Sequence, residues 1–307
     1  MFRVILVPLD GSTFAEHALP MAFYLALRSG ATLKLVHVHG TTPAEGMVTT
    51  YAASEPQARE RELSYLQNVA NRVQIASGVK LTTDLLDGPV PDAISEYVGA
   101  TGTDLMLLCT HARGPLGRFC LGSVADKLIR RVRIPILLMK PNESLADFTK
   151  KPALQRFLIP LDGSELAEQI LEPAVELGTL SGAELTLLRV IEPLPSLDYR
   201  TVELEDEAKK YLDHIASGVK ERLLHVRTRV IVQPRIASAI VAEAQAYSID
   251  LIALATHGRG GLARVMAGSV ADKVLRGAPT HVLVRHPLLQ SISSERNVAQ
   301  PHPTATT

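Results

Sequence analysis

The chain has 307 residues, 46% of them hydrophobic, and its 32 lysines and arginines balance its 32 aspartates and glutamates. That length suits two domains of ordinary size. The charge balance gives no indication of a basic nucleic-acid surface, and no apolar run approaches the roughly 20 residues of a membrane helix. The start of the sequence has no signal-peptide pattern, and two cysteines are too few for a disulfide framework or a paired zinc site. We therefore expect a cytoplasmic protein with reduced thiols and with neither nucleic-acid nor membrane partners.

Short apolar strands alternate with amphipathic helices along the first half. The periodicity predicts strands at 3–8, 33–39, 79–86, 104–109 and 134–140, and helices at 13–29, 57–76, 90–100 and 122–132. Gly30 stands where a helix C-cap is expected. In the second half, strands are predicted at 157–161, 184–191, 226–232, 250–255 and 280–285. Such alternation is typical of a mostly parallel sheet covered on both faces, so each half is expected to be a three-layer α/β/α domain.

The two halves of the chain are repeats of one sequence unit. VPLDGS at 7–12 recurs as IPLDGS at 159–164, IASGVK occurs at 75–80 and 215–220, and GSVADK aligns Gly122 with Gly268. The repeat predicts a first domain at 1–141, a polar linker at 142–154 and a second domain at 155–287. The tail at 288–307 loses the pattern and is expected to be disordered.

Two loops in each half carry residues suited to a phosphate ligand. Asp-Gly-Ser follows the first strand, and a glycine-containing loop follows the fourth strand and leads into a helix that begins with Gly-Ser. In open α/β sheets, ligands bind beyond the carboxyl ends of the strands where the strand order reverses, and a helix N-terminus attracts anions. An aspartate there suits a ribose or adenine donor. The alternative is that the loops are structural turns and the serines only cap their helices.

These residues resemble the universal stress protein family, whose members have a Val-Pro-x-Asp-Gly-Ser strand end and a G-x2-G-x9-G-[ST] loop. At the three glycine positions the second half has Ala255, Gly258 and Gly268, and the first half has Cys109, Ala112 and Gly122. Both halves are covered, so the chain resembles a tandem member of the family. The resemblance implies two doubly wound domains, each with a five-stranded parallel sheet of order 3-2-1-4-5, as in adenine nucleotide α-hydrolase folds.

The resemblance also implies ATP as ligand, with magnesium as an optional companion. The implied aspartates contact the nucleoside, the valines line the adenine pocket, and the loop with the helix start holds the phosphates and ribose. In the first half the binding residues are Pro8, Asp10, Val38, Gly88, Thr110, His111, Ala112, Arg113, Gly122, Ser123 and Val124. In the second half they are Pro160, Asp162, Val190, Thr256, His257, Gly258, Arg259, Gly268, Ser269 and Val270. The two arginines are the better candidates for phosphate contact, since they are permanently charged, although solvated loop arginines are the alternative.

Both implied sites depart from the family pattern. Neither half keeps the first glycine, and Ala112 places a methyl group where the backbone would approach a phosphate. The second half has Gln233 where the first has Gly88. ATP is therefore expected in the second half first, and its binding in the first half stays open. His111 and His257 have no partner carboxylate at a suitable spacing, so no catalytic residue and no metal site are expected.

Three functions remain open at this point. The first is a nucleotide-responsive stress or signalling module that binds ATP and acts through a protein partner. The second is a nucleotide-free interaction scaffold of the same fold, which the lost glycines favour. The third is an enzyme that hydrolyses ATP weakly or adenylates a substrate, but the S-G-G-x-D-S and H-I-G-H motifs of such enzymes are absent. A dedicated enzyme is not expected.

Two further expectations concern assembly and the longest loop. The apolar last strands of the two halves are expected to pair with each other, which makes the chain an internal pseudo-dimer, while a homodimer of the whole chain stays open. The long loop at 39–56 occurs only in the first half, and a lid over the first site is a hypothesis for it.

Overall fold

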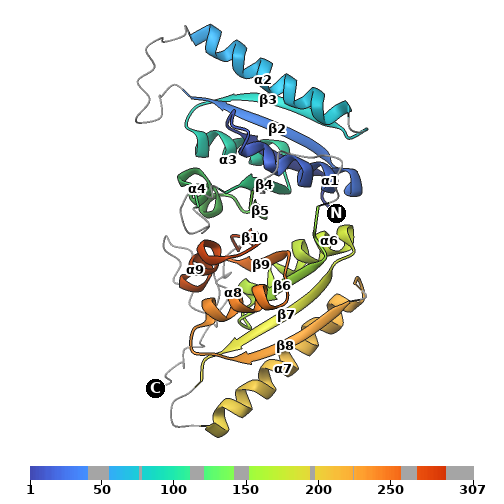
Figure 1. Cartoon of the computed structure of the whole chain (residues 1–307), viewed down its shortest axis with the longest axis vertical. Helices are drawn as coiled ribbons and strands as arrows, with labels where there is room; N and C mark the ends of the chain where they lie inside the picture. The colour runs from blue at the N-terminus through green and yellow to red at the C-terminus, as the bar shows by residue number, and fades with distance from the viewer. Residues whose placement is uncertain are drawn as a thin grey trace, which may run out of the picture.

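A computed structural model of the chain describes residues 1–40, 55–75, 78–110, 121–141, 152–193, 198–223, 225–256 and 268–287. Strands and helices follow the predicted order in both halves (Figure 1). The first half consists of β1 (Val4–Leu9), the 3-10 helix η1 (Ala15–Ala18), α1 (Leu19–Ser29), β2 (Thr32–His39), α2 (Glu55–Ile75), β3 (Leu81–Asp87), α3 (Val90–Thr101), β4 (Leu105–Cys109), α4 (Ser123–Arg131) and β5 (Ile136–Met139). The second half consists of β6 (Arg156–Pro160), α5 (Glu165–Glu168), α6 (Leu171–Ser181), β7 (Glu184–Ile191), α7 (Asp198–Lys220), β8 (Val226–Val232), α8 (Ile236–Ala246), β9 (Leu251–Ala255), α9 (Ser269–Gly277) and β10 (His281–Arg285).

The helix predicted at 13–29 is divided into η1 and α1. Pro20 lies in the first turn of α1, where its missing N–H group costs nothing, whereas its ring would disrupt a helix that continued from residue 13. The second half shows the same division between α5 and α6, with Pro173 near the start of α6. Gly30 ends α1 in the left-handed conformation, at φ 73°, as the sequence predicts.

All ten strands form one sheet in the order β3-β2-β1-β4-β5-β10-β9-β6-β7-β8. Within each half the strands are parallel and follow the order 3-2-1-4-5, which confirms the doubly wound fold. β5 and β10 pair antiparallel and join the halves, so the last strands do pair within the chain. Leu137 faces Leu283 there, and the two are equivalent residues of the repeat, so the junction has pseudo-two-fold symmetry.

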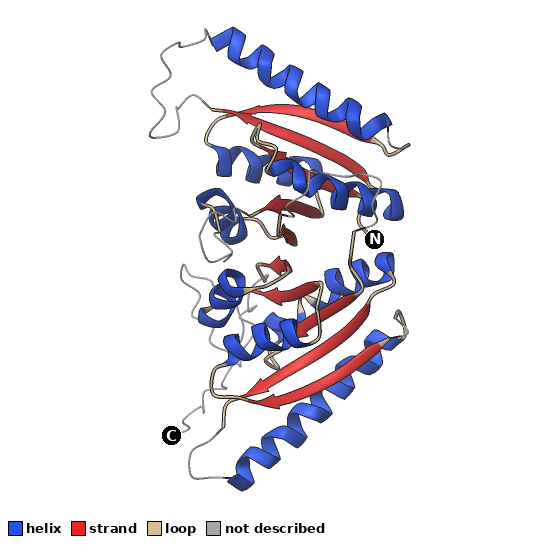
Figure 2. Ribbon diagram, viewed as in Figure 1, coloured by secondary structure: helices blue, strands red, loops and turns tan. Residues whose placement is uncertain are grey.

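Helices cover both faces of the sheet (Figure 2). One face is covered by α1, α2, α6 and α7, which pack on strand residues such as Leu35 and Leu187. The other is covered by α3, α4, α8 and α9, which pack on residues such as Met106 and Ile252. Each cluster of buried side chains contains residues of both halves, so burial connects the two repeats of the chain.

Two of the predicted regions fall largely outside the described residues. The tail at 288–307 does so entirely, and the linker is described only from residue 152. Leu154, near its end, is 1% exposed and belongs to the core on the α1 side of the sheet. Within the described ranges, no helix is long and apolar enough to cross a membrane.

Candidate functional site

An aspartate holds the turn at the carboxyl end of the first strand in each half. Asp10 Oδ1 accepts hydrogen bonds from the Ser12 N–H at 2.9 Å and from the Ser12 hydroxyl at 2.5 Å. Asp162 holds Ser164 in the same way, at 3.0 and 2.6 Å. The glycine between them has φ 81° in the first half and 78° in the second, a conformation that favours glycine. The motif Asp-Gly-Ser is therefore a turn that fixes one carboxylate oxygen beside the strand end.

The serine of the same turn leads into the next helix. The Ser12 hydroxyl oxygen accepts the N–H of Ala15 at 3.2 Å, and the Ser164 hydroxyl oxygen accepts the N–H of Ala167 at 3.2 Å as the N-cap of α5. The aspartate, the serine and the helix start thus form one hydrogen-bonded unit. Its geometry is nearly identical in the two halves.

The valines implied for the adenine pocket are mostly buried. Val38 is 8% exposed and Val190 is 9% exposed, and both belong to the core on the side of α3 and α8. Pro8 and Pro160 are half-buried in the strands β1 and β6. These four residues therefore offer a ligand only a small apolar surface at the strand ends.

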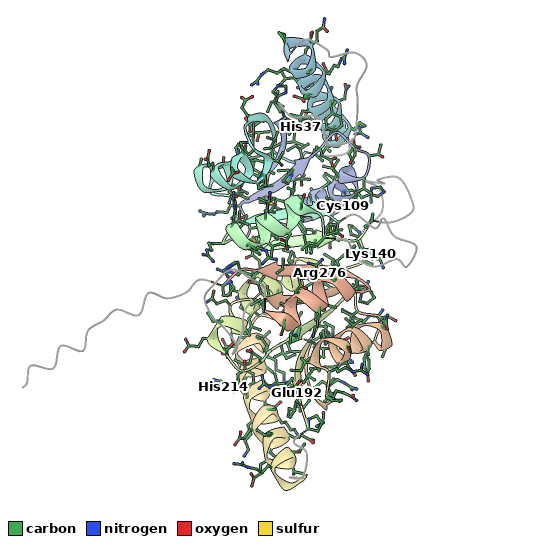
Figure 3. The ribbon with its side chains drawn as sticks, turned by 90° about the vertical axis from the view of Figure 1, so that its left-hand side faces the viewer. His37, Cys109, Lys140, Glu192, His214 and Arg276 are labelled. Carbon is green, nitrogen blue, oxygen red and sulfur yellow. The ribbon has the colours of Figure 1, made fainter. Side chains whose placement is uncertain are left out.

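A polar cluster that the sequence does not predict lies at the end of β2. His37 Nδ1 lies 2.8 Å from the carbonyl oxygen of Leu9, which can only accept, so this nitrogen carries a proton. His37 Nε2 lies 3.6 Å from Glu62 Oε1, and His39 Nδ1 lies 2.6 Å from Glu62 Oε2 (Figure 3). Two histidines two residues apart in a strand share one face, which is the signal that could have found them. In the second half, Arg189 donates to the carbonyl oxygen of Leu161 at 3.1 Å.

Gly88 follows β3, the outer strand of the first half. It has φ 112°, so the left-handed turn explains the glycine. Asp87 beside it binds the guanidinium of Arg59 at 2.5 and 3.1 Å, and this hydrogen bond lowers the pKa of the Asp87 carboxyl. Because β2 lies between β3 and β1, the sheet does not place Gly88 next to Asp10.

The threonines at the ends of β4 and β9 hold the start of the glycine loops. Thr110 donates to the carbonyl oxygen of Met139 from its N–H at 3.0 Å and from its hydroxyl at 3.2 Å. The Thr256 N–H donates to the carbonyl oxygen of Arg285 at 2.9 Å, and both threonines are 1% exposed. These threonines bind the neighbouring strand, and their burial favours that structural role over the predicted ligand contact.

The second glycine loop returns to the residue from which it leaves the sheet. The Gly268 N–H donates to the carbonyl oxygen of Thr256 at 2.7 Å, and a Cβ atom on Gly268 would lie 3.2 Å from the same oxygen. Any other residue would need the Thr256 backbone to shift slightly. The close approach brings the end of β9 and the start of α9 together.

The helices α4 and α9 begin with uncapped first turns. Their N-caps are Gly122 and Gly268, both with extended backbone and without a side chain, so Ser123 and Ser269 are the first helical residues and not the caps. Both serines are exposed. The first N–H groups of each helix, together with the positive end of its dipole, can therefore bind an anion.

Cys109 ends β4 (Figure 3), and its thiol is close enough to the Asp10 carboxylate to interact with its charge. Burial, reinforced by the Asp10 carboxylate, raises the pKa of the Cys109 thiol to about 12. Cys109 is a free thiol, as expected, and it stays protonated at neutral pH, so it is no nucleophile.

Several predicted residues lie outside the described residues: His111, Ala112, Arg113, Cys120, His257, Gly258, Arg259 and most of the loop proposed as a lid. Across the ranges that the structure describes, no group of three or more histidine, cysteine or acidic side chains is placed to hold a metal ion.

Comparison with known proteins identifies the family. The sequence pattern of the universal stress protein family matches residues 1–140 and 153–286. The universal stress protein Rv2005c of Mycobacterium tuberculosis is 28% identical over 294 residues, which cover 91% of this chain and 96% of that protein. A universal stress protein from Archaeoglobus fulgidus has a similar fold, with a TM-score of 0.68 at 20% identity over 92% of this chain and 98% of that one. A putative universal stress protein from Pseudomonas aeruginosa gives 0.67 at 18% identity over 93% and 94%. The chain belongs to the universal stress protein family, in a tandem form with two copies of the domain.

Proposed function

We propose that the second half binds ATP, with magnesium, at the carboxyl ends of β6 and β9, and that the chain acts as a nucleotide-responsive stress or signalling module through a protein partner. One observation carries the proposal. The turn of Asp162 and the start of α9 follow adjacent strands, β6 and β9, and α9 begins at Gly268, which lies close to the Thr256 carbonyl oxygen and has no side chain to cap the first N–H groups of the helix.

Each part of this arrangement has a role toward the nucleotide. The first N–H groups of α9 and the positive end of its dipole favour the binding of the phosphate groups, because these carry the negative charge of ATP. The Asp162 carboxylate accepts a ribose hydroxyl or the adenine amino group. Val190 and Pro160 contribute the small apolar surface next to the base. The first half has the same frame but lacks two glycines of its loop, so we assign the ATP site to the second half.

The alternatives make different use of the same residues. In a nucleotide-free scaffold, Asp162 and Thr256 would only hold the turn and the loop start, and α9 would begin without a ligand. In a weak ATP hydrolase, a base would have to stand beside the phosphates, and the described carboxylate in the first turn of α9, Asp272, is held by Arg276 at 3.0 Å. With two cysteines in the sequence and a half-buried free thiol at Cys109, the proposed module suits a reducing compartment, and we place it in the cytoplasm.

The test is the nucleotide retained by the purified protein, released with acid and identified by chromatography. Gly268→Asp puts a carboxylate against the Thr256 carbonyl oxygen and the phosphate position, and Gly122→Asp is the matched change in the first half. We expect ATP in the wild type and in Gly122→Asp, and none in Gly268→Asp. If the wild type retains none and no binding is seen when ATP and magnesium are titrated, the protein is a scaffold.

A further inference from the structure

The two halves differ in charge next to the start of the glycine loop. Met139 ends β5 beside Thr110, and Arg285 ends β10 beside Thr256, with the N–H of each threonine donating to the carbonyl oxygen of its neighbour. Met139 and Arg285 are equivalent residues of the repeat. The second half therefore has a guanidinium where the first half has an uncharged thioether.

The Arg285 guanidinium has an unused donor. Its Nη1 donates to the carbonyl oxygen of Gln169 at 3.1 Å, whereas its Nε is buried and has no hydrogen-bond partner among the described residues. Burial lowers the pKa of Arg285, and the nearby Glu172 carboxylate raises it. Glu172 is itself paired with Arg222 at 2.6 Å. Since an arginine remains charged in proteins, Arg285 is a partly desolvated cation that an anion would stabilise.

Arg285 lies beside the proposed site, on β10, which pairs with β9 on the side away from β6. Its backbone pairs with Ala255, one residue before Thr256. Its side chain reaches Gln169, the C-cap of α5, which is the short helix that starts from the turn of Asp162. The positive charge therefore lies on the face of the sheet that α5 and α6 cover, one strand from the loop start and at the opposite end of α5 from the aspartate turn.

The strand ends of the first half carry carboxylates that the second half lacks. Glu62 faces the histidines at the end of β2, and Asp87 ends β3. From the burial pattern of α2 and α7 and the register of β3 and β8, the equivalent residues in the second half are Ala208 and Val232. Glu192, which follows β7, is a carboxylate of the second half, but it is exposed to solvent. The loop arginines occur at equivalent positions in both halves, so they do not distinguish the sites.

We propose that the two halves are specialised for ligands of different charge, with Arg285 making the second half selective for the triphosphate and the first half favouring a nucleoside or a monophosphate. This inference rests on the proposed ATP site. A unit charge roughly 10 Å from a phosphate, at an effective dielectric constant of about 20, changes binding on the order of tenfold for each ligand charge. Discrimination among ligands should therefore increase with the number of phosphates.

The test is a charge series of ligands. ATP, ADP, AMP and adenosine are titrated by calorimetry into Gly122→Asp protein, which confines binding to the second half, and into the same protein with Arg285→Met, the residue of the first half. We expect Arg285→Met to weaken the binding of ATP about tenfold or more, to weaken the binding of AMP less, and to leave the binding of adenosine unchanged. Arg285→Lys keeps the charge and should preserve the order, and Arg285→Gln serves if the methionine variant does not fold.

The outcomes separate this inference from the proposed function. Equal weakening of ATP and adenosine, or a lysine variant as damaged as the methionine variant, would show that Arg285 only caps α5 and would overturn the inference. The inference also fails, with the ATP site intact, if all variants bind as the parent does. If the parent binds none of the four ligands, the proposed function itself fails.

Discussion

His281 makes the junction between the halves sensitive to acid. It begins β10, and its Nδ1 accepts the N–H of Lys140 at 3.1 Å. Lys140 is the residue after β5 and is labelled in Figure 3. Burial lowers the pKa of His281 from 6.5 to about 4, with Lys140 acting in the same direction and Asp250 in the opposite one. Only the neutral ring can accept this hydrogen bond, so protonation removes a contact that crosses the junction.

The sign and size of the effect follow from the two pKa values. The unfolded chain binds a proton at this histidine below about pH 6.5, whereas the folded protein does so only near pH 4. Between these values the unfolded state holds more protons, so stability falls as the pH falls from 6.5 toward 4. At pH 5 the loss is about 2 kcal/mol of unfolding free energy.

Urea unfolding at pH 7.5 and pH 5 measures this loss. His281→Asn keeps an acceptor near the position of Nδ1 but does not titrate, and His214→Gln, at an exposed position on α7, is the control. We expect the wild type and His214→Gln to lose about 2 kcal/mol more than His281→Asn between the two pH values. Equal losses in all three proteins would refute the reasoning.

Three further outcomes follow from the contacts of single residues. Gly268→Ala, with its Cβ 3.2 Å from the Thr256 carbonyl oxygen, should weaken ATP binding in calorimetry and lower the stability by less than about 1 kcal/mol. The control Gly99→Ala, whose Cβ lies in open space, should bind ATP as the wild type does. Equal affinities of the two variants would contradict this. Arg72→Met removes the guanidinium that lies 2.6 Å from the Glu16 carboxylate, which is 7% exposed, and should lower the free energy of urea unfolding at pH 7 by about 2 kcal/mol. This is less than for a fully buried pair because Arg72 is half exposed. The double variant with Glu16→Gln should recover most of the loss, and no recovery would argue against the pair. In a Cys120→Ser background, Cys109 should react with a disulfide reagent at pH 8 about a thousandfold more slowly in the folded protein than in the protein unfolded in urea. The reason is that folding raises the pKa of the thiol from 9.0 to about 12. Similar rates would count against the burial of the thiol.

The fold was predictable because both faces of the sheet are buried. Strands such as Leu105–Cys109 and Leu251–Ala255 are then continuous apolar runs, and glycine or proline marks many of their borders. The packing between the halves was not predictable in the same way. Arg28 donates to the carbonyl oxygen of Leu180 at 3.1 Å, a contact between α1 and α6 that depends on the pairing of β5 with β10.

The candidate site was predictable where its chemistry is local. The turn of Asp10 needs only a carboxylate, a glycine and a serine in sequence, so the motif reveals it. The spacing of His37 and His39 puts them on one face of β2, but their contact with Glu62 requires α2 to pack over β2 across a long loop, and nothing local in the sequence pairs the histidines with Glu62. The burial of Thr256 likewise depends on β10, which follows β9 only after α9.

In the proposed function, an adenine nucleotide binds across the ends of β6 and β9. The most direct test is a crystal structure of the protein grown with magnesium and a slowly hydrolysed ATP analogue. We predict density for the triphosphate against the N–H groups of Ser269 and Val270, with the ribose or base within hydrogen-bond distance of Asp162. Empty strand ends in the second half at saturating analogue, or a nucleotide bound elsewhere on the surface, would contradict the account.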